Sequence, residues 1–148
     1  MEIVRRSAIG ADELLESGVQ NCFSFGPVLV ENGEITKESV STRRENNPRT
    51  MLGMVEPGHF IAVVVVGRQE GYSVGISGEE SAKLMKELGC TLAYNLDGGQ
   101  SAAMIFMGIK LNQDSDGRYN GLSAKNRTMP DGLTWGYSAL CGTFANQQ

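Results

Sequence analysis

The chain has 148 residues, of which 41% are hydrophobic and 20% are charged. This is enough for a folded core, so we expect one soluble domain over residues 1–148. The formal net charge is −4, and basic residues cluster only at Arg5–Arg6 and Arg43–Arg44, so nucleic acid is not an expected partner.

Several other features are disfavoured by the sequence. No apolar run is long enough to span a membrane, and the first residues lack the apolar segment and cleavage site of a signal peptide. The three cysteines, Cys22, Cys90 and Cys141, have no C-x-x-C spacing, which argues against a disulfide framework and a zinc knuckle. We expect each cysteine to be a small buried hydrophobic residue.

The first elements along the chain are short. Residues 10–18 predict a helix, because acidic residues occupy its first turn and Gly18 fits its end. The runs "VLV" and "EIT" on either side of Glu31–Asn32–Gly33 predict a hairpin. Residues 41–49 are polar and contain a proline, so we expect a loop that leads into an apolar segment at 51–55.

The central part of the sequence is the most regular. "FIAVVVV", residues 60–66, is typical of a strand buried on both faces. Ser77 and Glu80 have the spacing of a capping box, an apolar stripe follows, and Gly89 ends the predicted helix. Residues 91–96, "TLAYNL", predict a second strand.

Strand, helix and strand together predict a βαβ unit with parallel strands. Both strands would then end at the same edge of the sheet, which brings Gly67–Arg68 close to Asp97–Gly98–Gly99. A hairpin around Gly108 and a polar stretch at 112–133 follow. The expected fold class is therefore α/β or α+β, a single domain with a mixed β-sheet that contains a βαβ unit, with helices packed on the sheet and additional β-hairpins.

The stretch "NLDGGQS", residues 95–101, has the composition of an anion-binding loop. Adjacent glycines allow backbone amides to converge on an anion, and Asp97 and Ser101 add a carboxylate and a hydroxyl. A plain glycine-rich turn, capped by Asp97, explains the same residues. Composition alone leaves both interpretations open.

Other polar residues are weaker candidates. Arg49 follows a proline and has the forked donors that suit a phosphate, although it is also an ordinary loop residue. The single histidine, His59, supports neither a catalytic triad nor a metal cluster. Asp114 and Asp116 suggest a solvated loop rather than a calcium site, and Trp135 with Tyr137 fits either a core strand or sugar stacking.

Four motifs in this order resemble the phosphodiester glycosidase family. They are "FSFGPVLVENG", "NPRTMLG", "VVVVGRQEGYSVGISGEESAKLMKELGC" and "YNLDGGQSAAM", and together they cover about residues 10–112. The family includes the uncovering enzyme that removes N-acetylglucosamine from mannose-6-phosphate tags, and many bacterial envelope proteins. The resemblance implies hydrolysis of a sugar-1-phosphodiester, on envelope or extracellular glycans, to a sugar and a phosphomonoester.

The resemblance also implies the site. Arg49, Arg68 and Asp97 are the candidate catalytic residues: the two arginines would neutralise the phosphodiester, and Asp97 would orient sugar hydroxyls or act as acid or base. The Gly98 and Gly99 amides would stabilise charge on the phosphodiester oxygens. The candidate substrate-binding residues are Thr50, Gly67, Asn95, Gly98, Gly99 and Ser101. No cofactor is predicted, and participation of a divalent metal stays open.

Three departures from the family pattern keep a second hypothesis open. Gln100 replaces the third glycine of the common D-G-G-G-S, where it would strain or narrow the site if that position needs positive φ or a close approach of the ligand. No counterpart of the family's upstream N-G-[GD]-F/Y-F-type motif is visible, so part of the family domain would be absent, and Arg127 only loosely matches its last arginine. The alternative is a non-catalytic carbohydrate- or phosphate-binding module. The expected partner in either case is a sugar phosphate or glycan, outside the cell or in its envelope for the parent family protein.

Overall fold

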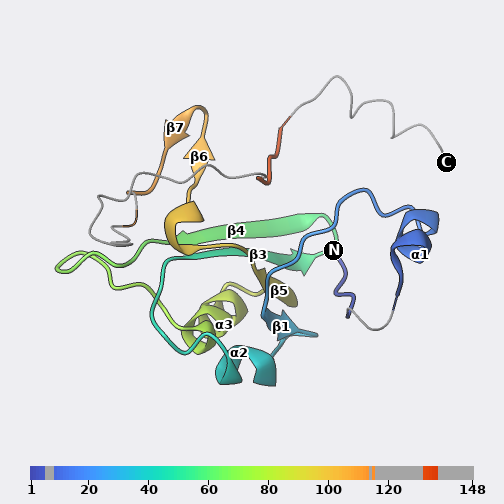
Figure 1. Cartoon of the computed structure of the whole chain (residues 1–148), viewed down its shortest axis with the longest axis horizontal. Helices are drawn as coiled ribbons and strands as arrows, with labels where there is room; N and C mark the ends of the chain where they lie inside the picture. Colours follow the sequence, from blue (N-terminus) through green and yellow to red (C-terminus); the bar gives the residue numbers. More distant parts are fainter. Residues whose placement is uncertain (6–8, 114, 116–131, 137–148) are drawn as a thin grey trace.

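The computed structural model describes residues 1–5, 9–113, 115 and 132–136. Its centre is a five-stranded sheet in the order β2-β1-β5-β3-β4, in which every neighbouring pair is antiparallel (Figure 1). The strands are β1 Val28–Glu31, β2 Glu34–Ile35, β3 Arg49–Glu56, β4 His59–Val65 and β5 Leu92–Asn95. The protein therefore has a mixed α+β architecture, as expected, although the sheet itself is antiparallel rather than mixed.

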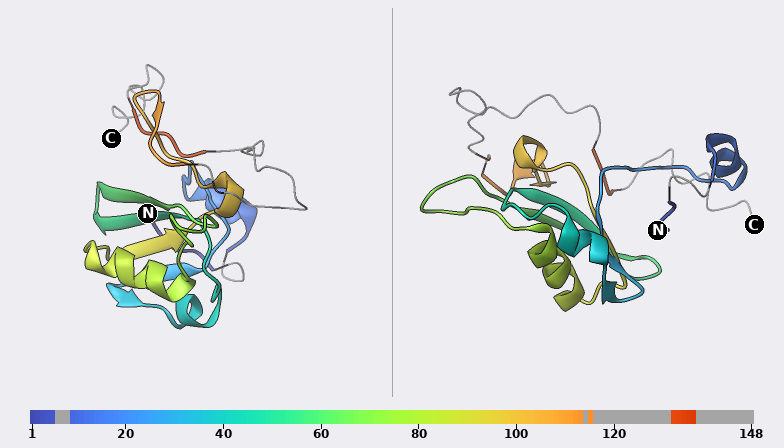
Figure 2. Two further views of the ribbon diagram at one scale, coloured as in Figure 1. Left: turned by 90° about the vertical axis from the view of Figure 1, so that its left-hand side faces the viewer. Right: turned by 60° about the horizontal axis from the view of Figure 1, so that its bottom comes forward.

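Two helices cover one face of this sheet. Figures 1 and 2 show α2 (Lys37–Ser41) and α3 (Gly78–Glu87) on the same side, and α3 contacts β1, β2 and β3. The core lies between these helices and the sheet and is formed by Leu29, Val30, Met51, Ala82, Met85, Cys90 and Ala93. Gly53 of β3 has no side chain to hold the layers apart, since a Cβ there would come within 2.6 Å of Met85 Cε.

The helix α3 begins as its sequence predicts. The Ser77 hydroxyl accepts a hydrogen bond from the Glu80 N–H at 3.2 Å, and Glu80 Oε2 accepts one from the Ser77 N–H at 2.8 Å. Lys83 and Glu79, one turn apart, form an ion pair at 2.7 Å. The capping box is thus confirmed.

Other local predictions are also confirmed. The 10–18 region contains α1 (Ala11–Glu16), β1 and β2 form the predicted hairpin, and β6 (Ile105–Phe106) pairs with β7 (Ile109–Lys110) around Gly108. The helix α2 was not predicted; Thr36 caps it by accepting a hydrogen bond from the Ser39 N–H at 3.1 Å.

The predicted direct pairing of the two central strands is wrong. β3, which was expected only as an apolar segment, turns at Pro57–Gly58 into β4 and lies between β4 and β5. A hairpin partner is close in sequence, so β4 pairs with it before any distant strand. Because β3 is antiparallel to both neighbours, β4 and β5 still run in the same direction, and α3 connects them.

Burial corrects two further predictions. No residue of β4 is fully buried, because it is the edge strand of the described sheet, so the expected burial on both faces is wrong. Cys90 is buried as expected, whereas Cys22 is exposed. Trp135 is 60% exposed, which excludes a core role for it. Asp114, Asp116, Arg127, Tyr137 and Cys141 lie outside the described residues.

Candidate functional site

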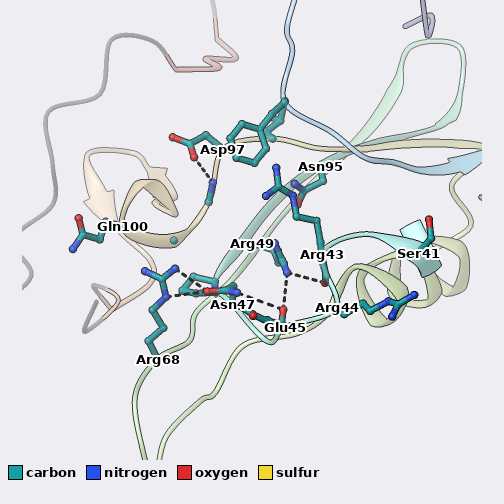
Figure 3. A pocket seen from close by; sticks show the side chains of 15 residues that line it. Ser41, Arg43, Arg44, Glu45, Asn47, Arg49, Arg68, Asn95, Asp97 and Gln100 are labelled. Carbon is teal, nitrogen blue, oxygen red and sulfur yellow. Dashed lines mark hydrogen bonds between the residues drawn. The ribbon is translucent and has the colours of Figure 1, made fainter. Parts of the chain in front are cut away.

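A pocket of about 930 Å³ lies at the edge of the sheet where β4 and β5 end and β3 begins (Figure 3). This is the edge that the sequence predicted, because the two strands share a direction. Six predicted site residues line the pocket: Arg49, Arg68, Asn95, Asp97, Gly98 and Gly99. The other three, Thr50, Gly67 and Ser101, are not among its lining residues.

The carboxylate of Asp97 is held within its own loop. Its Oδ1 accepts a hydrogen bond from the Gly98 N–H at 3.0 Å, and its Oδ2 accepts one from the Ser101 hydroxyl at 2.8 Å. Ser101 is therefore a residue that orients Asp97 rather than one that lines the pocket. These two contacts fix the orientation of the carboxylate at the pocket.

The two loop glycines differ from their predicted role. The Gly98 N–H donates to Asp97, and the Gly99 N–H donates to the Pro48 carbonyl at 3.0 Å. Both amides thus already have acceptors in this structure, so stabilising charge on a bound phosphodiester would require them to change or share these partners. The glycines instead allow close packing, since a Cβ at Gly98 would lie 2.6 Å from the Pro48 oxygen.

Arg68 projects its guanidinium beside this loop. Its backbone is left-handed, with φ of 59°, a conformation that is rare for a long side chain and often marks functional sites. Its Nε and Nη2 donate to Asn47 Oδ1 at 3.0 and 2.7 Å, which fixes the orientation of the plane. A Cβ on Gly99 would lie 3.4 Å from both terminal nitrogens, so this glycine lets the guanidinium approach the loop.

Arg49 is buried, with 6% of its surface exposed, and donates to backbone carbonyls. Nε donates to Ile76 at 3.0 Å, and Nη2 donates to Arg43 at 3.2 Å and Glu45 at 2.8 Å. These contacts tie the preceding loop to the start of β3 (Figure 3). Arg49 therefore adds a positive charge to the pocket, and its hydrogen bonds stabilise the pocket wall.

The charge balance of the pocket is positive. Its lining includes Arg43, Arg44, Arg49 and Arg68 but only two carboxylates, Glu45 and Asp97, on a chain whose net charge is −4. Burial lowers the pKa of Arg49 below its ordinary value, and the nearby charges of Arg43 and Arg68 lower that pKa further, whereas Glu45 raises it. An arginine stays protonated in proteins, so the site favours an anion.

Three of the predicted substrate-binding residues are buried or tightly packed near this edge of the sheet. The buried Asn95 donates from Nδ2 to the Gly26 carbonyl at 2.8 Å, while its Oδ1 has no hydrogen-bond partner among the described residues. The buried Thr50 hydroxyl likewise has none. Gly67 is a packing residue, since a Cβ there would lie 2.7 Å from Gly75 Cα.

Sequence reasoning missed several lining residues. Phe25 and Asn47 lie within two of the quoted motifs but were not named as site residues, and Arg43 was noted only as part of the basic cluster Arg43–Arg44. Gln100 also lines the pocket, and it lies in the short 3₁₀ helix η1 (Gly99–Ser101). Its φ is not positive, so the expected strain at this position is absent.

Within residues 1–5, 9–113, 115 and 132–136, no three histidine, cysteine or acidic side chains gather in a way that could hold a metal ion. No helix in the same part of the chain is both long and apolar enough to cross a membrane.

Several known proteins are similar to this chain in sequence or in fold. An uncharacterized protein from the SPbeta prophage of Bacillus subtilis strain 168, YomE, is 31% identical over 120 residues, which cover 79% of this chain and 18% of that protein. The catalytic domain of zebrafish N-acetylglucosamine-1-phosphodiester alpha-N-acetylglucosaminidase, auto-inhibited by its pro-peptide, matches with a TM-score of 0.54 and 26% identity. That match covers 69% of this chain and 38% of the zebrafish chain.

A crystal structure of a hypothetical protein from Synechocystis also matches, with a TM-score of 0.51 and 25% identity over 60% of this chain and 17% of that one. The chain thus spans less than two fifths of the length of each of these relatives. A family model described as phosphodiester glycosidase matches residues 3–134, most of the chain. The protein therefore belongs to the phosphodiester glycosidase family.

Proposed function

We propose that this protein hydrolyses a sugar-1-phosphodiester, adding water across the ester to release a free sugar and a phosphomonoester. The observation that carries the proposal is the convergence of Arg49, Arg68 and Asp97 on one positively charged pocket, although they come from three separate segments. The substrate would be part of a glycan outside the cell or in its envelope, as in the parent family.

Each residue has a role that its contacts support. Arg68, oriented by Asn47, binds a phosphodiester oxygen with the donors that Asn47 leaves unused. Asp97, oriented by Ser101, accepts a hydrogen bond from a sugar hydroxyl or transfers a proton to or from the reacting oxygen. The Asn95 Oδ1 accepts a hydrogen bond from the sugar, which would give this buried oxygen a partner.

A direct assay tests the proposal. The protein is incubated with the diester of N-acetylglucosamine 1-phosphate and methyl mannoside, and released N-acetylglucosamine is measured. We expect release by the wild type and a loss of about 100-fold or more in kcat for Asp97→Asn, the usual size of a general acid–base contribution. The matched control is Glu79→Gln on α3, outside the pocket lining, which should stay within twofold of the wild type. Labelled water then shows whether the C–O or the P–O bond is cut.

One observation favours a second candidate, a binding module without catalysis. The Gly98 and Gly99 amides and several Arg49 donors already bond within the protein, which leaves few donors for charge that develops during a reaction. In that case the wild type binds the diester and releases no sugar. Full activity of Asp97→Asn would instead show that the site is assigned to the wrong residue.

A further inference from the structure

Arg43 is held in an unusual backbone conformation at the pocket wall. Its φ is 52°, in the left-handed region, where a long side chain is strained. Its carbonyl oxygen accepts hydrogen bonds from the Gly78 N–H at 2.8 Å and from Arg49 Nη2 at 3.2 Å. The start of α3 and the buried arginine thus fix the backbone from which the Arg43 side chain leaves.

The guanidinium of Arg43 stacks on an aromatic ring. Its Cζ lies 4.8 Å from the centre of the Phe25 ring, and the Phe25 N–H donates to the Tyr94 hydroxyl at 3.1 Å, which anchors that residue. Stacking covers one face of the guanidinium and leaves the N–H groups at its edge available. Its orientation is therefore set before any ligand arrives.

Arg43 differs from other arginines of the chain in what its donors contact. Arg68 donates to Asn47, Arg49 to three carbonyls, and Arg5 to Glu31 at 2.8 Å. The Arg43 side chain has no hydrogen bond or ion pair with any described residue. The adjacent Arg44 also lines the pocket, but it has no aromatic platform among the described residues.

The two oriented guanidiniums occupy different parts of the pocket. Arg68 lies beside the Gly99 loop, whereas Arg43 lies on the side of Phe25 and Asn95 (Figure 3). A phosphodiester group carries one negative charge and would bind one guanidinium. If it binds Arg68, the stacked Arg43 faces a different part of the same ligand.

We propose that Arg43, stacked on Phe25, is a second anion-binding position of this pocket, for a carboxylate or phosphate group of the ligand other than the phosphodiester bound at Arg68. This inference rests on the proposed function and narrows its substrate class to sugar phosphodiesters that carry another negative charge. The bound oxyanion accepts two N–H donors of the fork side by side.

Three matched diesters of N-acetylglucosamine 1-phosphate test this position. Their alcohols are glycerol, glycerate and glycerol 3-phosphate, so the second group is neutral, a carboxylate or a phosphate. We expect kcat/KM, and the affinity measured by calorimetry, to favour at least one charged diester over the glycerol diester by about tenfold, as one oriented charge-assisted contact gives. Whichever charged diester is preferred identifies the group that binds at Arg43.

Variants connect this preference to the proposed residues. Arg43→Gln should reduce the ratio between the charged diester and the glycerol diester to about one. Phe25→Leu keeps the charge of Arg43 but removes the aromatic ring beneath it, so it should reduce this ratio only in part. Arg5→Gln, which removes the same charge at a side chain outside the pocket lining, should retain it. Circular dichroism and thermal unfolding establish that each variant is folded.

The outcomes separate this inference from the proposed function. If no diester is hydrolysed, the proposed function fails, and calorimetry still measures the preference between charged and neutral diesters. If sugar is released from all three at equal kcat/KM and they bind equally, the second anion position is overturned while the activity stands. The second anion position is also overturned if Arg43→Gln still prefers the charged diester. Should Arg43→Gln not fold, a preference of undiminished size in Phe25→Leu overturns it instead.

Discussion

The residues that build the candidate site have separate tasks, which their contacts distinguish. Arg49 donates from Nε to the Ile76 carbonyl and from Nη2 to two carbonyls of the loop before β3. A substitution of Arg49 therefore alters the pocket wall together with its charge. Arg68 is exposed and bonds to a single side-chain oxygen. A loss of function in an Arg68 variant therefore reports on ligand binding more directly than a loss in an Arg49 variant.

At the same scale, Gly98 is required by the space around it. A Cβ at this position would lie 2.6 Å from the Pro48 oxygen, which also accepts the Gly99 N–H. Gly98→Ala should lower the free energy of unfolding by about 1–3 kcal/mol, the usual cost of forcing extra volume into a packed site. It should also weaken ligand binding, because the Asp97 loop must move away from Pro48.

Urea unfolding checks the Gly98 prediction. Gly132→Ala is the matched control, since its Cβ would meet no atom of the described residues within 4 Å and its φ is not positive. This control should change the free energy of unfolding by less than about 0.5 kcal/mol. Equal effects of the two substitutions would contradict the steric argument.

Among the elements, α3 is the one whose sequence signals and structure agree most closely. It connects β4 to β5 and packs its buried face, Ala82 and Met85 among others, on the sheet. Its first residue, Gly78, also donates to the Arg43 carbonyl at 2.8 Å. The start of this helix thus supports both the core and the pocket wall.

The capping box of α3 makes stability depend on pH. Hydrogen bonds from the Ser77 N–H and then the Ser77 hydroxyl lower the pKa of Glu80 below its ordinary value. A carboxyl with a lowered folded pKa stabilises the fold fully above its unfolded pKa, about 4.3, and loses this contribution as pH falls through the folded pKa.

Glu80→Gln should therefore lower the melting temperature at pH 7 and lower it less at pH 3. Thermal unfolding followed by circular dichroism at both pH values measures this difference. Lys86→Gln is the control at the other end of α3, because it leaves the capping box intact. If Glu80→Gln has the same effect at pH 3 as at pH 7, the ionised capping box is not the cause.

At the scale of the whole molecule, apolar surface is concentrated on one projection. The β6–β7 hairpin extends from the sheet on the side opposite α2 and α3 (Figures 1 and 2). Ile105, Phe106, Met107 and Ile109 are between 66% and 85% exposed. A cluster of this kind favours association with other apolar surfaces, including that of a second copy.

Replacing Phe106 and Met107 with serine should therefore reduce self-association without destabilising the sheet. The measurements are the apparent mass in light scattering as protein concentration rises, and the fluorescence of a dye that binds apolar surfaces. Val74→Ser is the control, because Val74 is 63% exposed and lies outside the hairpin. Unchanged association in the double variant would show that the hairpin is not responsible.

The sequence by itself determined several local elements and the family. A capping box, a glycine turn between β-prone runs and a stop glycine act within a few residues, so α3 and the two hairpins follow from neighbouring side chains. The shared edge of Arg68 and Asp97 was also predictable, because a crossover helix returns the chain in the same direction. Motif resemblance placed Arg49, Arg68 and Asp97 in one site, and they line one pocket.

Only the tertiary structure decided how the strands pair and where donors are directed. β3 lies between β4 and β5, which depends on competition among all strands for partners and is not written in any one segment. Likewise, the Gly98 N–H donates to Asp97, the Gly99 N–H donates to the Pro48 carbonyl, and Arg49 donates to carbonyls, because folding brings these acceptors beside the donors. The contact of Arg43 with Phe25 joins residues far apart in the sequence, and the fold alone brings them together at the pocket.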